Sequence, residues 1–127
     1  KENEKLIGNI KIGPISKKHM TSDLVVFIGD TDYLGKGLAV EGIKLGNQAA
    51  FNAHSVRKLF GGMFRGNIAS VKAYTRADWM IEGILEGQYL VDGKSEDRIL
   101  VACFNPELFD VAKIMRNSLK IEDVYEI

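Results

Sequence analysis

The stretch GDTDYLGKGLAVEGIKLGNQAAF, residues 29–51, decides the fold of this chain because the spacing of apolar side chains changes within it. The run just ahead of it, SDLVVFIG at 22–29, is rich in β-branched residues and bounded by turn formers, which predicts a strand covered on both faces. From Gly37 onward the spacing becomes helical and predicts an amphipathic helix ending near Asn52, with small or apolar residues at Ala39, Ile43, Gly46 and Ala50. A glycine-containing loop therefore connects a strand to a helix.

The composition is that of a single ordinary globular domain. The chain has 127 residues, of which 46% are hydrophobic, and its 17 Lys and Arg residues balance 17 Asp and Glu residues. Because there is no basic excess and no apolar run of bilayer length, we expect no nucleic-acid partner, no membrane association and a cytoplasmic location. The single cysteine, Cys103, lies in the apolar run ILVACF, which predicts a buried hydrophobic residue, not a nucleophile.

The remaining elements follow from periodicity and turn signals. The segment 5–16 is expected to form a strand that ends in a turn at Gly13 and Pro14, and this strand is expected to pair with the strand at 22–29 as an antiparallel hairpin. A strand at 57–64, after the helix, implies a right-handed parallel crossover. Asp92 and Gly93 are a typical hairpin turn. The other predicted elements are a helix at 67–77 and strands at 79–91 and 97–104, followed by a tail at 105–127 with helical spacing and no recognisable chemistry.

The glycine loop has the properties of an anion site. Gly35 and Gly37 can adopt positive φ, and the helix after them begins with backbone N–H groups that have no partner inside the helix. Such a helix end favours a phosphate group. A Walker loop is excluded because glycine and leucine follow Lys36, and a dinucleotide fingerprint is disfavoured because Val40 replaces its third glycine. A phosphate site and a purely structural turn both remain open.

A second segment predicts a polar pocket wall. Asn67, Ser70 and Tyr74 are spaced i, i+3, i+7, which places three hydrogen-bonding side chains on one face of the predicted helix. Ile68, Val71 and Thr75 take the side that faces the core. The alternative is a helix cap, with Asn67 as the N-cap residue, followed by two incidental polar residues.

Together the two segments resemble the GCN5-related N-acetyltransferases, in particular the branch of ribosomal-protein N-terminal and bacterial sugar-amine acetyltransferases. The likeness runs from about Leu6 to Phe104, and its specific parts are FIGDTDYLGKGLAVEGIKL at 27–45 and NIASVKAYTRADWMIEGILEG at 67–87. It implies the acyl-CoA N-acyltransferase fold: a mixed, mostly antiparallel α/β sheet, splayed at the cofactor site, with helices on both faces. The chain would be one domain, 1–127, without the strand and helices that begin family members.

The resemblance also implies an activity, the transfer of an acetyl group from acetyl-CoA to a primary amine. Tyr74 would protonate the leaving thiolate. Asp23 is the candidate base, the alternative being an aspartate that only ends a strand or forms a turn. A backbone N–H at 27–29 would meet the oxyanion. The implied cofactor-binding residues are Phe27 and Ile28 for the pantetheine arm, Leu34, Gly35, Lys36, Gly37, Leu38 and Ala39 for the pyrophosphate, and Asn67 and Ser70 from the other side.

Departures from the family pattern keep alternatives open. Gly62 stands where some relatives have an acid, and Asp78 replaces the glycine of a turn, although aspartate tolerates left-handed φ. Trp79 is expected in the core. The partner implied is an amine acceptor, which could be a protein N-terminus, an amino sugar or another small amine; no metal is implied, and a homodimer is one assembly to test. The rival functions are a non-catalytic acyl-CoA-binding or interaction module and a nucleotide-binding α/β domain.

Overall fold

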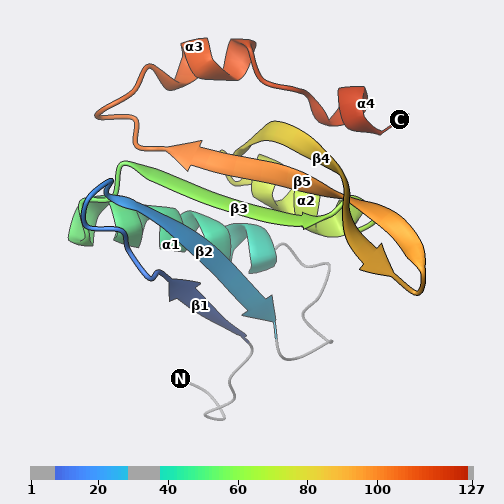
Figure 1. The fold of residues 1–127 in the computed structure, drawn as a ribbon. Coiled ribbons are helices and arrows are strands. Elements are labelled where there is room, and N and C mark those ends of the chain that lie inside the picture. Colours follow the sequence, from blue (N-terminus) through green and yellow to red (C-terminus); the bar gives the residue numbers. More distant parts are fainter. Residues whose placement is uncertain (1–7, 29–37, 126–127) are drawn as a thin grey trace.

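The computed structural model of the protein describes residues 8–28 and 38–125 (Figure 1). Five strands form a sheet in the order β1-β2-β3-β5-β4. The strands are β1 (Gly8–Ile12), β2 (Thr21–Ile28), β3 (Lys58–Phe64), β4 (Met80–Val91) and β5 (Lys94–Phe104). The helices are α1 (Leu38–Ala53), α2 (Ile68–Arg76), α3 (Val111–Arg116) and α4 (Ile121–Val124). Every element expected between residues 5 and 104 is therefore present, with boundaries shifted by a few residues.

The sheet is mostly antiparallel, as predicted. β1 pairs with β2 in a hairpin, from Gly8 opposite Ile28 to Ile12 opposite Leu24. β2 and β3 are the parallel pair, and α1 connects them in the predicted crossover. Their ladder has only three residue pairs, the last of which joins Asp23 to Phe60. Beyond it the two strands run apart, which Figure 1 shows; we call this separation the splay.

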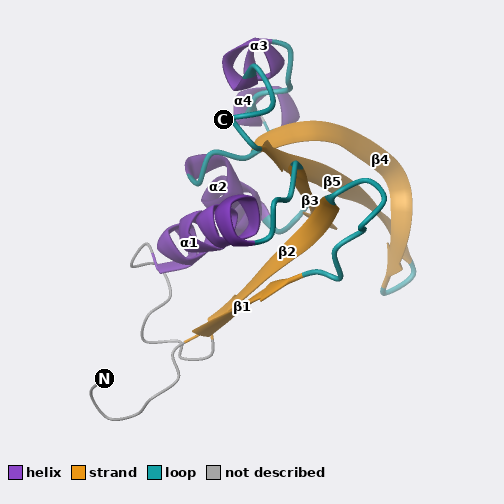
Figure 2. Ribbon diagram, turned by 90° about the vertical axis from the view of Figure 1, so that its left-hand side faces the viewer, coloured by secondary structure: helices purple, strands orange, loops and turns teal. Residues whose placement is uncertain are grey.

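One face of the sheet packs against α1 and α2. Their side chains, including Ile43 and Val71, share a buried cluster with Leu59 of β3 and with the inward residues of β5. Figure 2 shows both helices on the same side of the sheet, so the expectation of helices on both faces is not met by this pair. Because side chains alternate along a strand, Phe60 and Phe64 point to the opposite face, where they are 43% and 44% exposed.

The hairpin of β4 and β5 is long and curved. Asp92 and Gly93 form its turn, and both have positive φ, 52° and 78°, as a type I′ turn requires. The β4–β5 register shifts twice, between Ile81 and Gly83 and again between Leu85 and Tyr89. Such irregularities bend a strand, and Figure 2 shows the hairpin curling around the face opposite α1 and α2.

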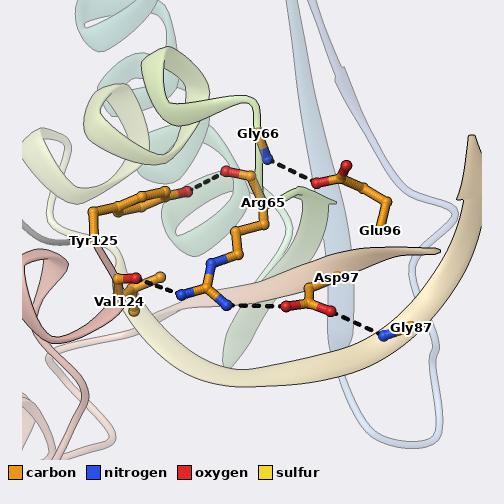
Figure 3. Close-up of polar contacts among 7 residues, drawn as sticks. All are labelled: Arg65, Gly66, Gly87, Glu96, Asp97, Val124 and Tyr125. Atoms are coloured by element: carbon orange, nitrogen blue, oxygen red, sulfur yellow. Dashed lines mark hydrogen bonds and ion pairs between the residues drawn. The ribbon is translucent and has the colours of Figure 1, made fainter. Parts of the chain in front are cut away.

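The C-terminal segment is fastened to the sheet through Arg65, which directly follows β3 (Figure 3). Its guanidinium donates to Asp97 Oδ2 at 2.9 Å and to the Val124 carbonyl at 2.6 Å, while the Tyr125 hydroxyl donates to the Arg65 carbonyl at 2.5 Å. A backbone N–H from Gly87, and then the Arg65 guanidinium, hold the pKa of Asp97 below its usual value. Within the described residues, no helix is long and apolar enough to cross a membrane.

Candidate active site

A pocket of about 280 Å³ lies at the splay. We call it the splay pocket. Two of its lining residues, Ser70 and Tyr74, come from α2 on the helix-covered side, whereas Phe60 and Gly62 belong to the opposite face of β3. The pocket therefore has lining residues from both faces of the sheet, beside the end of the β2–β3 ladder. Its lining residues are Asp23, Leu24, Phe60, Gly61, Gly62, Met63, Ser70, Tyr74, Arg98 and Val101.

Tyr74 reaches the splay from α2. Its hydroxyl donates a hydrogen bond of 3.0 Å to the carbonyl of Leu24, one residue past the last ladder residue of β2. Its ring packs edge-on against Trp79, with 4.7 Å between ring centroids. The phenol is therefore fixed at both ends, with its proton-bearing oxygen at the point where the strands separate.

Trp79 is a core residue, as predicted. Its indole N–H donates to Asn47 Oδ1 at 2.8 Å, and Asn47 Nδ2 donates to the Ala77 carbonyl at 2.9 Å. Both side chains are buried, so the amide of Asn47 satisfies two polar groups that water does not reach. This network ties α1 to the end of α2 and supports the ring on which Tyr74 packs.

The turn after α2 also forms as predicted. The N–H groups of Ala77 and Trp79 both donate to the Tyr74 carbonyl, and Asp78 between them has a φ of 74°. A bond from the third residue after the helix back to the last helical turn, with a left-handed residue just before the donor, is the Schellman arrangement. Aspartate therefore takes the place that glycine usually fills at this kind of helix end.

Asp23, on β2, also lines the splay pocket, and it directly precedes Leu24, whose carbonyl accepts the hydrogen bond from Tyr74. Its carboxylate oxygen Oδ1 is buried and has no hydrogen-bond partner among the described residues. A buried carboxylate oxygen without a donor is costly, so a ligand that donates a hydrogen bond to it would be favoured. Asp23, Ser70 and Tyr74, which the sequence analysis selected from two distant segments, thus line one pocket.

The other candidate residues divide into two groups. Asn67 caps α2 by accepting a bond from the Ser70 N–H at 3.2 Å, which confirms its predicted structural role. Phe27 and Ile28 end β2, and Leu38 and Ala39 begin α1. Residues 34–37 of the predicted phosphate loop lie outside the described part of the chain. Cofactor binding by all of these residues stays a prediction.

Arg98 and Gly62 are pocket residues that the sequence analysis did not select as a pair. Arg98 Nε is buried and, among the described residues, has no hydrogen-bond partner. It lies directly over Gly62, since a Cβ atom on that glycine would be 2.1 Å from Arg98 Nε. The available signal was a charged residue on the same strand face as Leu100 and Ala102 of β5, but only the pairing of β5 with β3 brings it to the pocket.

Cys103 has no part in the splay pocket. It is 4% exposed, and burial raises the pKa of its thiol to about 12, which confirms the prediction of a buried hydrophobic residue. It lines a second, larger cavity of about 390 Å³ between α1 and α3, together with Phe51 and Met115. Across the described ranges, no group of three His, Cys, Asp or Glu side chains could hold a metal ion.

The fold, with its splayed parallel pair, is the acyl-CoA N-acyltransferase fold, and comparisons with known proteins agree at that level. No protein-family model matches the chain. The chain is similar to the probable N-acetyltransferase YjcK of Bacillus subtilis (strain 168), with 24% identity over 104 residues. The match covers 82% of this chain and 58% of YjcK, so the chain spans less than two thirds of that relative.

Solved acetyltransferases share the architecture. A mutant of the spermidine N-acetyltransferase SpeG from Vibrio cholerae superposes with a TM-score of 0.77 at 19% identity, covering 88% of this chain and 66% of SpeG. The ribosomal-protein-S5-alanine acetyltransferase of Vibrio fischeri gives a TM-score of 0.70 at 22% identity, covering 80% of this chain and 55% of that enzyme. The predicted fold class, and the resemblance to GCN5-related N-acetyltransferases at the level of the fold, are confirmed.

Proposed function

We propose that the protein is an N-acetyltransferase that transfers an acetyl group from acetyl-CoA to a primary amine by direct attack. The observation that carries the proposal is the splay pocket, which lies where the parallel strands separate. It is lined by Tyr74 and by Asp23, whose buried Oδ1 has no hydrogen-bond partner among the described residues. The similarity to YjcK, and a fold shared with SpeG and the ribosomal-protein acetyltransferase, support the same activity.

The cofactor would lie along the open edge of β2. Pairing of β2 with β3 ends at Asp23, so the backbone toward Phe27 and Ile28 has no β3 ladder and can pair with an amide-bearing chain. α1 begins at Leu38, so its first N–H groups, which have no partner inside the helix, would contribute to the proposed pyrophosphate site at residues 34–39. Asn67 and Ser70 would contact the cofactor from α2.

Acetyl-CoA supplies the thioester whose acyl group is transferred. A primary amine is mostly protonated at neutral pH, so one proton must leave before its lone pair can attack. Asp23 is the group placed to accept it, because its buried oxygen lacks a hydrogen-bond donor. The N–C bond then forms, and a backbone N–H at 27–29 stabilises the oxyanion.

Tyr74 completes the proton balance when the C–S bond breaks. A thiol has an ordinary pKa of about 8.5 and a tyrosine about 10, so the phenol can protonate the leaving thiolate and then recover a proton from the new amide nitrogen. One proton leaves on Asp23 and one ends on the thiol, which balances the reaction of an ammonium ion with a thioester.

Two measurements test the proposal. Isothermal titration calorimetry should show acetyl-CoA binding to the folded protein, with competition by free coenzyme A and none by adenine dinucleotides. Release of free thiol, followed with a panel of primary amines, should depend on the amine. Binding without amine-dependent thiol release would instead identify a non-catalytic acyl-CoA-binding module, and an absence of binding would refute both.

A further inference from the structure

The splay pocket contains a positive charge that acetyl transfer as described above does not use. Arg98 extends from β5 across Gly62 of β3 toward the pocket, and its Nε is buried without a partner. No hydrogen bond or ion pair joins its guanidinium to another described residue. An unpaired buried donor on a charged group is among the most costly arrangements in a folded protein.

Arg98 and Asp23 are the two charged residues in the lining of the splay pocket. They lie on the same face of the sheet, yet they form no ion pair, and each has one buried atom without a hydrogen-bond partner. If the guanidinium and the carboxylate were in direct contact, their charges would cancel and they would need no ligand. Two opposite charges held apart in one pocket instead match a ligand that carries both signs, with its cation beside Asp23 and its anion beside Arg98.

Gly62 makes this arrangement possible. Any side chain at this position would begin 2.1 Å from Arg98 Nε and 2.6 Å from its Cζ, so it would exclude the guanidinium from its present place. The glycine therefore has a definite consequence for the chemistry of the pocket, because it leaves room for a guanidinium in the pocket lining.

From this geometry we propose, on the basis of the acetyltransferase function above, that the acceptor is an amine that also carries an anionic group, a carboxylate or a phosphate. Arg98 binds that anionic group, and Asp23 receives the ammonium group and its proton. A planar guanidinium suits both anions because it can donate two parallel N–H bonds. A polyamine such as the spermidine named for SpeG would bring further positive charge toward Arg98, so this pocket disfavours it.

The test compares matched amines in the thiol-release assay. O-Phosphoethanolamine is paired with ethanolamine, and β-alanine with β-alaninamide, so in each pair one amine carries an anionic group and the other does not. Spermidine is included as an acceptor with additional positive charge. We expect kcat/KM to be at least about tenfold higher for the anionic member of one pair, because one charge-assisted hydrogen bond contributes enough binding free energy for a tenfold change. The phosphate and carboxylate pairs show which anion the site takes.

Variants assign the preference to Arg98. Arg98→Gln should reduce the anionic preference about tenfold, mainly through the KM of the anionic amines, whereas Arg98→Lys should retain part of the preference. Arg116→Gln is the matched control because Arg116 is an exposed arginine on α3, outside the pocket lining. Acetyl-CoA affinity, measured for every variant, should be unchanged, and thermal denaturation shows whether each variant folds.

The outcomes separate this inference from the proposed function. If acetyl-CoA binds and amines are acetylated, but Arg98→Gln leaves the anionic preference unchanged or spermidine is the best acceptor, the inference about the acceptor is wrong. If acetyl-CoA does not bind, while calorimetry shows that O-phosphoethanolamine or β-alanine binds the native protein and not Arg98→Gln, the acetyltransferase function fails and the anion site stands. If neither anionic amine binds or reacts, the inference is overturned.

Discussion

Replacing Tyr74 by phenylalanine removes one hydroxyl and keeps the ring that packs on Trp79. The lost hydrogen bond to the Leu24 carbonyl, 3.0 Å long and partly buried, contributes about 1 kcal/mol to stability. For a domain of this size that lowers the melting temperature by roughly 3–5 °C. The catalytic effect should be much larger, because loss of a positioned general acid typically lowers the rate by about 10²–10⁴.

Tyr125→Phe is the matched control for Tyr74→Phe. The Tyr125 hydroxyl also donates to a backbone carbonyl, that of Arg65 at 2.5 Å, but it lies outside the splay pocket. Both variants should lose a similar amount of stability, and the Tyr74 variant alone should lose kcat in the thiol-release assay, with unchanged acetyl-CoA affinity. Equal kcat values for the two variants would refute the assignment of Tyr74 as general acid.

Three further predictions concern the supports of the site and the remaining titratable groups. Asn47→Ala leaves the indole N–H of Trp79 and a backbone carbonyl without partners, so urea denaturation should show a loss of about 2–4 kcal/mol; a loss below 1 kcal/mol would contradict the network. The backbone N–H of Gly87, and then the Arg65 guanidinium, lower the pKa of Asp97. The ionised Asp97 carboxylate therefore stabilises the fold above about pH 4, and this stabilisation is lost as the pH falls further. Asp97→Asn should therefore flatten the pH dependence of unfolding below about pH 4, and an unchanged slope would argue against the ionised carboxylate. Because burial raises the pKa of Cys103 to about 12, a thiol reagent at pH 8 should modify it only after denaturation, and rapid labelling of the folded protein would contradict the buried position.

The order of elements could be predicted from local sequence because each one has a local cause. The change of apolar spacing after Gly37, the cap at Asn67 and the turn at Asp92 and Gly93 each depend on neighbouring residues, and all three appear in the structure. Asp78 belongs to the same group, since its left-handed conformation follows from its place at a helix end.

The composition of the splay pocket could be predicted only in part. Tyr74 and Ser70 share one helix face, so their common direction follows from spacing, and Asp23 was selected through a family resemblance. Arg98 reaches the pocket because β5 pairs with β3, a contact between segments far apart in the chain. Local periodicity does not give strand order, so the sequence places Arg98 on one face of a strand and cannot say which pocket that face meets.

The faces of the sheet that the helices cover could also be predicted only in part. The apolar face of α1 predicts that it packs on a sheet, and the crossover rule gives the hand of the β2–α1–β3 unit. Which face α2 takes depends on where β4 continues, and the structure places α1 and α2 on the same side (Figure 2). Phe60 and Phe64 are exposed on the other side for that reason.

A structure determined with coenzyme A or a non-hydrolysable acetyl-CoA analogue tests the central claim most directly. The account predicts that the sulfur atom lies in the splay pocket within hydrogen-bonding distance of the Tyr74 hydroxyl, with the pantetheine arm running along β2 toward the start of α1. A cofactor bound in the cavity between α1 and α3, or a sulfur atom remote from Tyr74, would contradict it.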